Sequence, residues 1–133
     1  MDKRYDDLGR LILRTGVAGL LLIHGLTKLQ NGIGFVQSQV SAAGLPAFIA
    51  YGVYIGEVVA PILVLIGLFA RPAALIMAFD LLGAIVLARS GDVATISRGG
   101  GLAVETELLF ILGSMAIACL GAGQFALGSG RLG

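Results

Sequence analysis

Residues 8–30 read LGRLILRTGVAGLLLIHGLTKLQ and decide the fold of this chain. The stretch has the length of a membrane-spanning helix, which needs about 20 mostly apolar residues. It nevertheless contains ionisable side chains, which share one stripe of a helix because they recur, together with Val17 and Leu21, at steps of four and three residues. They are Arg10, Arg14, His24 and Lys28. A charged stripe is too costly to face lipid, so the pattern predicts a membrane helix that turns this stripe toward other helices.

The composition of the whole chain also indicates a membrane protein. Of its 133 residues, 57% are hydrophobic and only 13% are charged, whereas about 25% of the residues of a typical soluble domain are charged. The net charge is +1, and the basic residues are scattered singly, so the chain lacks the basic stripe that nucleic acid binding needs. We therefore predict a single domain, residues 1–133, that lies in a lipid bilayer and does not bind nucleic acid.

Three further apolar segments predict three further membrane helices. Only residues 108–123 form an uninterrupted apolar run; the other segments contain ionisable residues, each of which costs about 2.5–3.5 kcal/mol at mid-membrane. The sequence thus predicts an all-α, integral membrane four-helix bundle with helices at residues 8–30, 47–70, 72–89 and 102–123. The bend between the second and third helices is expected at residues 70–72, because proline suits the first position of a helix.

The loops and the charges predict how the bundle lies in the membrane. An even number of spans puts both termini on one side, and the excess of Lys and Arg on that side predicts that it is the cytoplasmic side. Residues 31–46 alternate apolar and polar side chains at helical spacing, which predicts a short helix in the membrane interface between the first two spans. Residues 90–101 are polar and end in three glycines, which predicts a plain connection.

Ionisable side chains inside the spans are the candidate functional residues. Counted at 1.5 Å per residue from the outer ends of the helices, four of these side chains lie roughly 7–15 Å below the outer boundary of the membrane, so they can meet. The four are His24, Glu57, Asp80 and Glu107. The full set of ligand-binding or proton-handling candidates is His24, Glu57, Asp80, Glu107, Arg14, Lys28 and Tyr54. Such groups mark a site or pathway by default, but they can also tie helices together by polar contacts, and Tyr54 can equally belong to an aromatic belt or to the core.

The inventory of Cys and His limits the redox chemistry that the chain can perform by itself. Cys119 is the single cysteine, and His24 is the single histidine. An intrachain disulfide, a thiolate metal cluster and bis-histidine haem ligation all need more of these residues. We therefore predict no metal centre and no intrinsic cofactor, and any electrons must be carried by another molecule. Cys119 is interpreted as a small apolar packing residue.

Several short segments, in order along the chain, resemble the DoxX family of small bacterial and archaeal membrane proteins. The matching segments are LLIHGLTKL (21–29), AGLP (43–46), GE (56–57), LIGLFARPAAL (65–75), ELL (107–109) and GAG (121–123). The resemblance implies a four-helix bundle in the cytoplasmic membrane. It also implies a membrane subunit or partner of redox or sulfur-handling proteins, since some relatives are subunits of thiosulfate:quinone oxidoreductases.

Three functions remain as alternatives from the sequence. The first is a membrane subunit that binds a quinone-like molecule, because His24 with Glu57 or Asp80 supplies groups that bond quinone oxygens and exchange protons. The second is a small proton-coupled transporter, which would need a homo-oligomer. The third is a structural anchor for a soluble partner. On the first reading the chain is a possible subunit of a quinone-linked oxidoreductase and is not catalytic alone.

Overall fold

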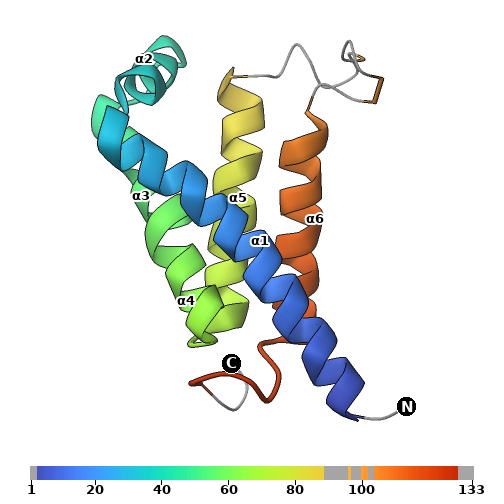
Figure 1. The fold of residues 1–133 in the computed structure, drawn as a ribbon. Helices are drawn as coiled ribbons and strands as arrows, with labels where there is room; N and C mark the ends of the chain where they lie inside the picture. The colour runs from blue at the N-terminus through green and yellow to red at the C-terminus, as the bar shows by residue number, and fades with distance from the viewer. Residues whose placement is uncertain (1–2, 89–95, 97–99, 102–103, 129–133) are drawn as a thin grey trace.

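The computed structural model describes residues 3–88, 96, 100–101 and 104–128, and these are almost entirely helical. A long helix, α1 (Lys3–Asn31), is followed by the short α2 (Gly34–Ala42). A second rod joins η1 (Ala47–Tyr51), α3 (Gly52–Tyr54), the π-helical turn η2 (Ile55–Val59) and α4 (Ala60–Ile66). Two more helices complete the bundle, α5 (Ala70–Ala88) and α6 (Glu105–Leu120). The predicted all-α fold is confirmed, with α1 crossing the other rods at a slant (Figure 1).

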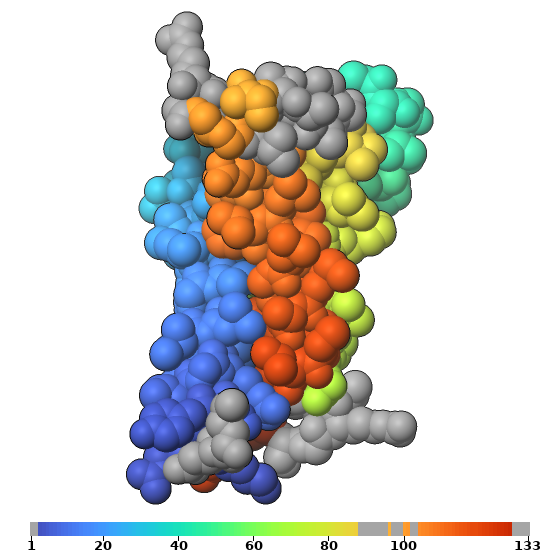
Figure 2. Space-filling view, turned by 90° about the vertical axis from the view of Figure 1, so that its right-hand side faces the viewer, coloured from blue at the N-terminus to red at the C-terminus, as the bar shows by residue number. Residues whose placement is uncertain are grey.

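Three helical rods are long and apolar enough to cross a membrane among the residues that the structure describes: Lys3–Asn31, Ala47–Ile66 and Ala70–Leu87. Helix α6 has 16 residues, which at 1.5 Å per residue is about 24 Å, less than the roughly 30 Å of the hydrocarbon core. It nevertheless runs beside α1 (Figure 2). A crossing by α6, and therefore the count of four spans, stays a prediction. The predicted connection at residues 90–101 lies almost wholly outside the described residues.

The predicted bend at residues 70–72 is wrong by three residues. Helix α4 ends at Ile66, and the chain turns at Gly67, whose φ of 74° is left-handed. The turn is closed by the Leu68 amide, which donates to the Leu63 carbonyl at 2.9 Å, a Schellman-type end that favours glycine. Pro72 lies instead in the first turn of α5, where its missing N–H leaves no carbonyl without a partner.

The predicted short helix after the first span is α2, shorter than the expected 31–46 segment. Val40 of α2 packs with Ile33 and Ala50, and these three residues form a small apolar cluster that also contacts Tyr54 and Leu87. The cluster fixes α2 across the end of the bundle where α1 stops (Figure 1). Its position in the membrane interface stays a prediction.

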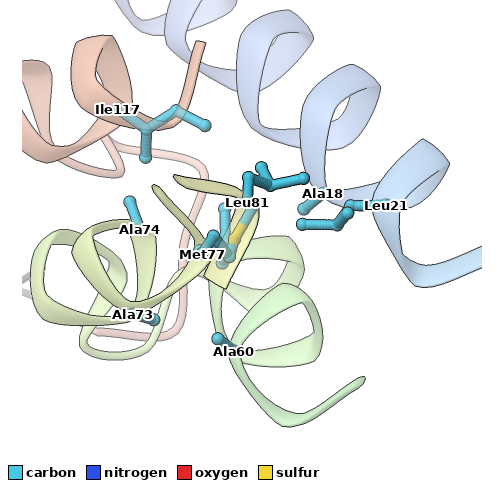
Figure 3. Packing of buried hydrophobic residues seen from close by; sticks show 9 residues of the cluster. Ala18, Leu21, Ala60, Ala73, Ala74, Met77, Leu81 and Ile117 are labelled. Carbon is cyan, nitrogen blue, oxygen red and sulfur yellow. The ribbon is translucent and has the colours of Figure 1, made fainter. Parts of the chain in front are cut away.

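Small side chains let the helices approach closely in the main core. Ala18, Ala60, Ala73 and Ala74 are all buried and come from α1, α4 and α5. Helix packing in a membrane depends on such small residues, because lipid provides no hydrophobic drive between helices. The larger members of this core are Leu21, Val64, Met77, Leu81 and Ile117, and Figure 3 shows Met77 and Leu81 at its centre.

The residues after α6 close the opposite end of the bundle. Leu127 and Gly128 donate their amides to the carbonyls of Ile66 and Gly67 at 2.9 and 3.0 Å. The Gln124 amide donates to the Asp7 carboxylate at 3.2 Å. The beginning of α1 and the segment 121–128 therefore lie at the same end of the bundle (Figure 1). Which side of the membrane this end faces stays a prediction.

Candidate functional site

A polar cavity of about 110 Å³ lies between α1, η2, α5 and α6. Leu21 and Leu81 line it and also belong to the main core, so the cavity continues directly from the core, toward the end of the bundle away from the segment 121–128. The complete lining is Leu21, His24, Lys28, Glu57, Asp80, Leu81, Ala84, Thr106, Glu107 and Phe110. Five of the seven residues predicted for the site are in this set: His24, Glu57, Asp80, Glu107 and Lys28.

Lys28 and Glu57 form an ion pair across the cavity. The Lys28 Nζ donates to Glu57 Oε1 at 2.9 Å and to Oε2 at 2.7 Å. The Glu57 side chain is 5% exposed and that of Lys28 is 32% exposed. The ammonium group therefore satisfies a carboxylate that would be costly to bury alone, and the pair joins α1 to η2.

Asp80 brings a second carboxyl group to the same ion pair. It lies close enough to interact electrostatically with both Glu57 and Lys28. Its Oδ2 atom is buried and accepts no hydrogen bond from the described part of the chain. Because the Lys28 ammonium group is bonded to Glu57 and Asp80 Oδ2 has no partner among the described residues, the cavity can accept a further hydrogen bond or a proton.

Two glycines allow the helices to come this close at the cavity. A Cβ atom on Gly25 would lie 2.0 Å from the Glu57 carbonyl oxygen, and one on Gly56 would lie 2.4 Å from the Asp80 Cβ. Both separations are far below contact distance, so α1 can approach η2, and η2 can approach α5, only where these residues have no side chain. Gly52, four residues before Gly56, has no contact within 4 Å of such a Cβ from another part of the described chain, so only Gly56 of these two glycines is a packing contact.

The π-helical turn η2 contains Glu57. Its wide geometry appears in the Ala60 amide, which donates to the Ile55 carbonyl five residues earlier. Pro61 follows at the start of α4 and has no amide hydrogen to donate. The regular four-residue bond to the Glu57 carbonyl is therefore impossible, which favours the wider turn. Single π turns of this kind are frequent at functional sites.

His24 and Phe110 face each other where α1 meets α6. Their rings are 5.7 Å apart at an angle of 82°, an edge-to-face contact. The His24 Nδ1 lies 3.1 Å from the Leu20 carbonyl oxygen. Because a carbonyl only accepts, Nδ1 is the donor of this bond, and Nε2 of the neutral ring remains as an acceptor. His24 can therefore receive a proton or bond a hydroxyl group at the cavity.

Arg14 and Tyr54, the remaining two predicted site residues, do not line the cavity. Arg14 is completely buried, and its guanidinium group donates to the carbonyls of Val64, Leu65 and Phe125. It neutralises the carbonyl-rich end of α4 and fixes the segment after α6. Tyr54 packs on the α2 cluster and lies 6.2 Å from the Tyr51 ring.

Sequence reasoning missed Gly25, Thr106 and Phe110 as parts of the site. Gly25 follows His24 and carried no chemical signal, although a glycine beside the polar stripe of the first helix could have been interpreted as a contact point. Thr106 and Phe110 are common residue types in membrane helices, so only the packing of α6 identifies them. Among the described residues, no group of three or more His, Cys, Asp or Glu side chains is arranged to hold a metal ion.

Comparison with known proteins identifies the family. Residues 9–90 match the family model described as DoxX. The chain belongs to the DoxX family. The match includes His24, Lys28, Glu57 and Asp80 of the cavity and ends before α6, so the resemblance seen in the sequence is confirmed for the first three rods.

Two relatives are each 35% identical to part of this chain. CatD of Bacillus subtilis (strain 168), provisionally named an oxidoreductase, is 35% identical over 86 residues, which cover 65% of this chain and 63% of CatD. The inner membrane protein YphA of Escherichia coli (strain K12) is 35% identical over 91 residues, which cover 63% of this chain and 65% of YphA. The match thus spans slightly less than two thirds of either relative. No solved structure matches the chain significantly.

Family and fold agree on the cellular location. The described chain has several helices that are long and apolar enough to span a bilayer, and its DoxX relative YphA is an inner membrane protein. This chain is a multi-pass protein of the bacterial inner membrane, as the sequence predicted.

Proposed function

We propose that this DoxX protein is the membrane subunit of a redox or sulfur-handling system, and that its polar cavity binds the head group of a quinone-like molecule. The observation that carries the proposal is the gathering of an ammonium group, an imidazole, three carboxyl groups and an aromatic ring from separate elements around one cavity. Ligand sites are typically apolar clefts with a few convergent polar groups. The relative named as an oxidoreductase is consistent with this function.

The chemistry of a quinone matches these groups. A quinone that becomes a hydroquinone takes up two electrons and two protons, one proton at each oxygen. Lys28 can donate a hydrogen bond to a quinone oxygen, and His24 can do so once Nε2 has taken up a proton, whereas the neutral ring accepts at Nε2 from a hydroquinone hydroxyl group. Glu57 with Asp80 can hold and deliver protons. The chain has one cysteine and one histidine, so the electrons come from a partner protein or its reduced sulfur substrate.

The proposal is tested by what the protein retains from its own membrane. The protein is extracted into lipid nanodiscs without detergent washing, and its lipids are analysed by mass spectrometry. We expect quinone to be enriched over the bulk membrane for the wild type. Asp80→Asn should lower the enrichment at least fivefold, whereas Glu105→Gln, an exposed carboxyl on α6 that does not line the cavity, should leave it unchanged. No enrichment in the wild type would refute quinone binding.

The buried carboxyl groups also support a second function, proton-coupled permeation by a homo-oligomer. Asp80 Oδ2 has no hydrogen-bond partner among the described residues, and it lies beside Glu57, an arrangement that suits a proton relay. Proton flux into liposomes that disappears in Glu57→Gln would favour this function over quinone binding. If His24→Ala and Asp80→Asn changed only stability or assembly, the chain would be a structural anchor.

A further inference from the structure

The cavity is too small for a whole amphipathic molecule. Pockets that enclose drug-sized ligands measure about 300–1,000 Å³, whereas this cavity measures about 110 Å³. A single ring therefore fills it, and the rest of a larger ligand must leave through one of its sides. Four of its boundaries can be described: the two sides that flank η2, the floor, and the α1–α6 side.

Close packing at two glycines closes the two sides that flank η2. At the α1–η2 side, Gly25 lies against the Glu57 carbonyl, and at the η2–α5 side, Gly56 lies against Asp80. Neither contact leaves room even for a methyl group. The floor is closed by Leu21 and Leu81 of the main core, which are 1% and 5% exposed.

At the level of the cavity, two side chains meet across the α1–α6 side. Here His24 is exposed and meets the half-buried Phe110 through ring edges 5.7 Å apart. Further toward the other end of the bundle, the same helices are in close contact, since a Cβ on Gly113 would lie 2.7 Å from Val17 Cγ2. The rings of His24 and Phe110 can move aside by rotamer changes, which exposed side chains make within nanoseconds, whereas the glycine contacts can open only if a helix moves.

The surface next to these two rings is apolar and suited to contact with lipid acyl chains. Ile23 and Leu109, their sequence neighbours on α1 and α6, are 59% and 64% exposed. His24 lies seven residues before the end of α1, and Phe110 five residues after the start of α6, which places them about 7–10 Å inside the helix ends. Figure 2 looks onto this face, with α1 and α6 side by side.

We infer that the cavity opens sideways into the acyl chains between α1 and α6, past His24 and Phe110, and that its ligand is an amphipathic molecule whose hydrocarbon tail stays in this seam. The inference rests on the proposed function and adds the substrate class: a tailed, membrane-dissolved quinone-like compound, and not a water-soluble one. His24 and Phe110 determine this specificity because they form the mouth.

A single-tryptophan experiment tests the opening without any ligand. The chain contains no tryptophan, so Phe110→Trp provides one fluorophore at the mouth. We expect strong quenching by lipids brominated on their acyl chains and little quenching by iodide in the water. Phe79→Trp, at a 79% exposed position on α5, is the lipid-facing control. Quenching of Phe110→Trp by iodide and not by brominated lipid would overturn the inference.

Addition of a ligand to the same variant then tests the sideways opening and the proposed quinone binding separately. Added decyl-tailed quinone should reduce lipid quenching of Phe110→Trp and leave Phe79→Trp unchanged. If the lipid quenching is present but the quinone does not alter it, the sideways opening stands and the quinone is refuted as its occupant.

A reversible crosslink keeps the inference testable if the tryptophan variant does not fold. A Cβ on Gly113 would lie 3.7 Å from the Val17 Cβ, within the 3.5–4.5 Å range of disulfides. Val17→Cys with Gly113→Cys, in a Cys119→Ser background, should form a disulfide that restrains the seam. Because rotation of the His24 and Phe110 rings opens the mouth without separation of the helices, oxidation should leave the binding rate of the decyl-tailed quinone unchanged. A rate that falls at least tenfold on oxidation and recovers on reduction would show that the helices must separate, and would overturn the opening by ring rotation.

Discussion

Lys28 and Glu57 show how one ion pair both joins helices and shapes the cavity. Glu57 is nearly inaccessible, whereas a third of the Lys28 side chain is exposed. Removal of one partner of a fully buried pair costs about 3–5 kcal/mol, and the partial exposure of Lys28 lowers this to about 1–3 kcal/mol. We expect Lys28→Met to destabilise the protein by this amount in SDS-induced unfolding.

The matching double variant separates the stabilisation by the Lys28–Glu57 ion pair from the effect of lost packing. Lys28→Met combined with Glu57→Gln should lower the stability by less than the sum of the two single variants. The double variant removes both charges, whereas each single variant leaves one charge without its partner. Additive costs would show that the two side chains act independently, contrary to the contact distances.

Arg14 is a structural residue in spite of its place on the polar stripe. Its guanidinium group serves three backbone carbonyls and lies outside the cavity. Hydrogen bonds to charged groups contribute about 1.5–3 kcal/mol each, so Arg14→Met should destabilise the protein by about 3 kcal/mol or more in the same unfolding assay.

Arg10→Met is the matched control, one turn earlier on α1. Arg10 is partly exposed, and it lies 3.9 Å from Asp7, a surface pair that contributes about 0–1 kcal/mol. Ligand affinity of the folded Arg14 variant should equal that of the wild type. A selective loss of binding with unchanged stability would return Arg14 to the functional site.

At the scale of the elements, the glycines decide which helices meet. Gly25→Ala should destabilise the bundle by more than 2 kcal/mol, because its Cβ would overlap the Glu57 carbonyl, and overpacking costs about 1–3 kcal/mol or more. Gly19→Ala on the same helix has no atom within 4 Å of the new Cβ and should be neutral or stabilising, since alanine favours a helix by about 1 kcal/mol over glycine.

A second glycine pair repeats the comparison on the neighbouring rod. Gly56→Ala should be destabilising because its Cβ would meet Asp80, and Gly52→Ala, with open space around it, should not be. The unfolding midpoints of all four variants check the order. Equal midpoints for Gly25→Ala and Gly19→Ala would show that α1 and η2 do not pack as described.

The sequence predicted elements better than their ends and their partners. The apolar runs were sufficient to predict the helices. The stripe of residues 10–28 was sufficient to predict that His24 and Lys28 of α1 face Glu57 of the next rod. The bend was misplaced because Pro72 and Gly67 both signal a boundary, and composition alone does not rank them. The structural role of Arg14 could not be predicted, because one of its hydrogen-bond acceptors, the Phe125 carbonyl, is 111 residues away in the sequence. The sequence also does not show whether a charged side chain on a helix stripe pairs with carboxylates or with backbone carbonyls.

For the whole molecule, the sidedness of the bundle is open to a direct test. The sequence predicts that α2 lies on the outer side and the ends of the chain on the cytoplasmic side. In a Cys119→Ser background, Ser38→Cys of α2 should react with a membrane-impermeant maleimide on intact spheroplasts. Tyr5→Cys, an exposed position near the start of α1, should react only after permeabilisation. The reverse pattern would invert the protein in the membrane.

The wide turn at Ile55–Val59 also affects how this family is compared. One additional residue within a helical turn rotates everything before it by about 100° relative to everything after it. A homologue with a regular helix here would therefore need a one-residue gap in any alignment. Without that gap, residues transferred by position from such a homologue would be assigned to the wrong face, and the acidic side chain of Glu57 would be equated with one that points into lipid.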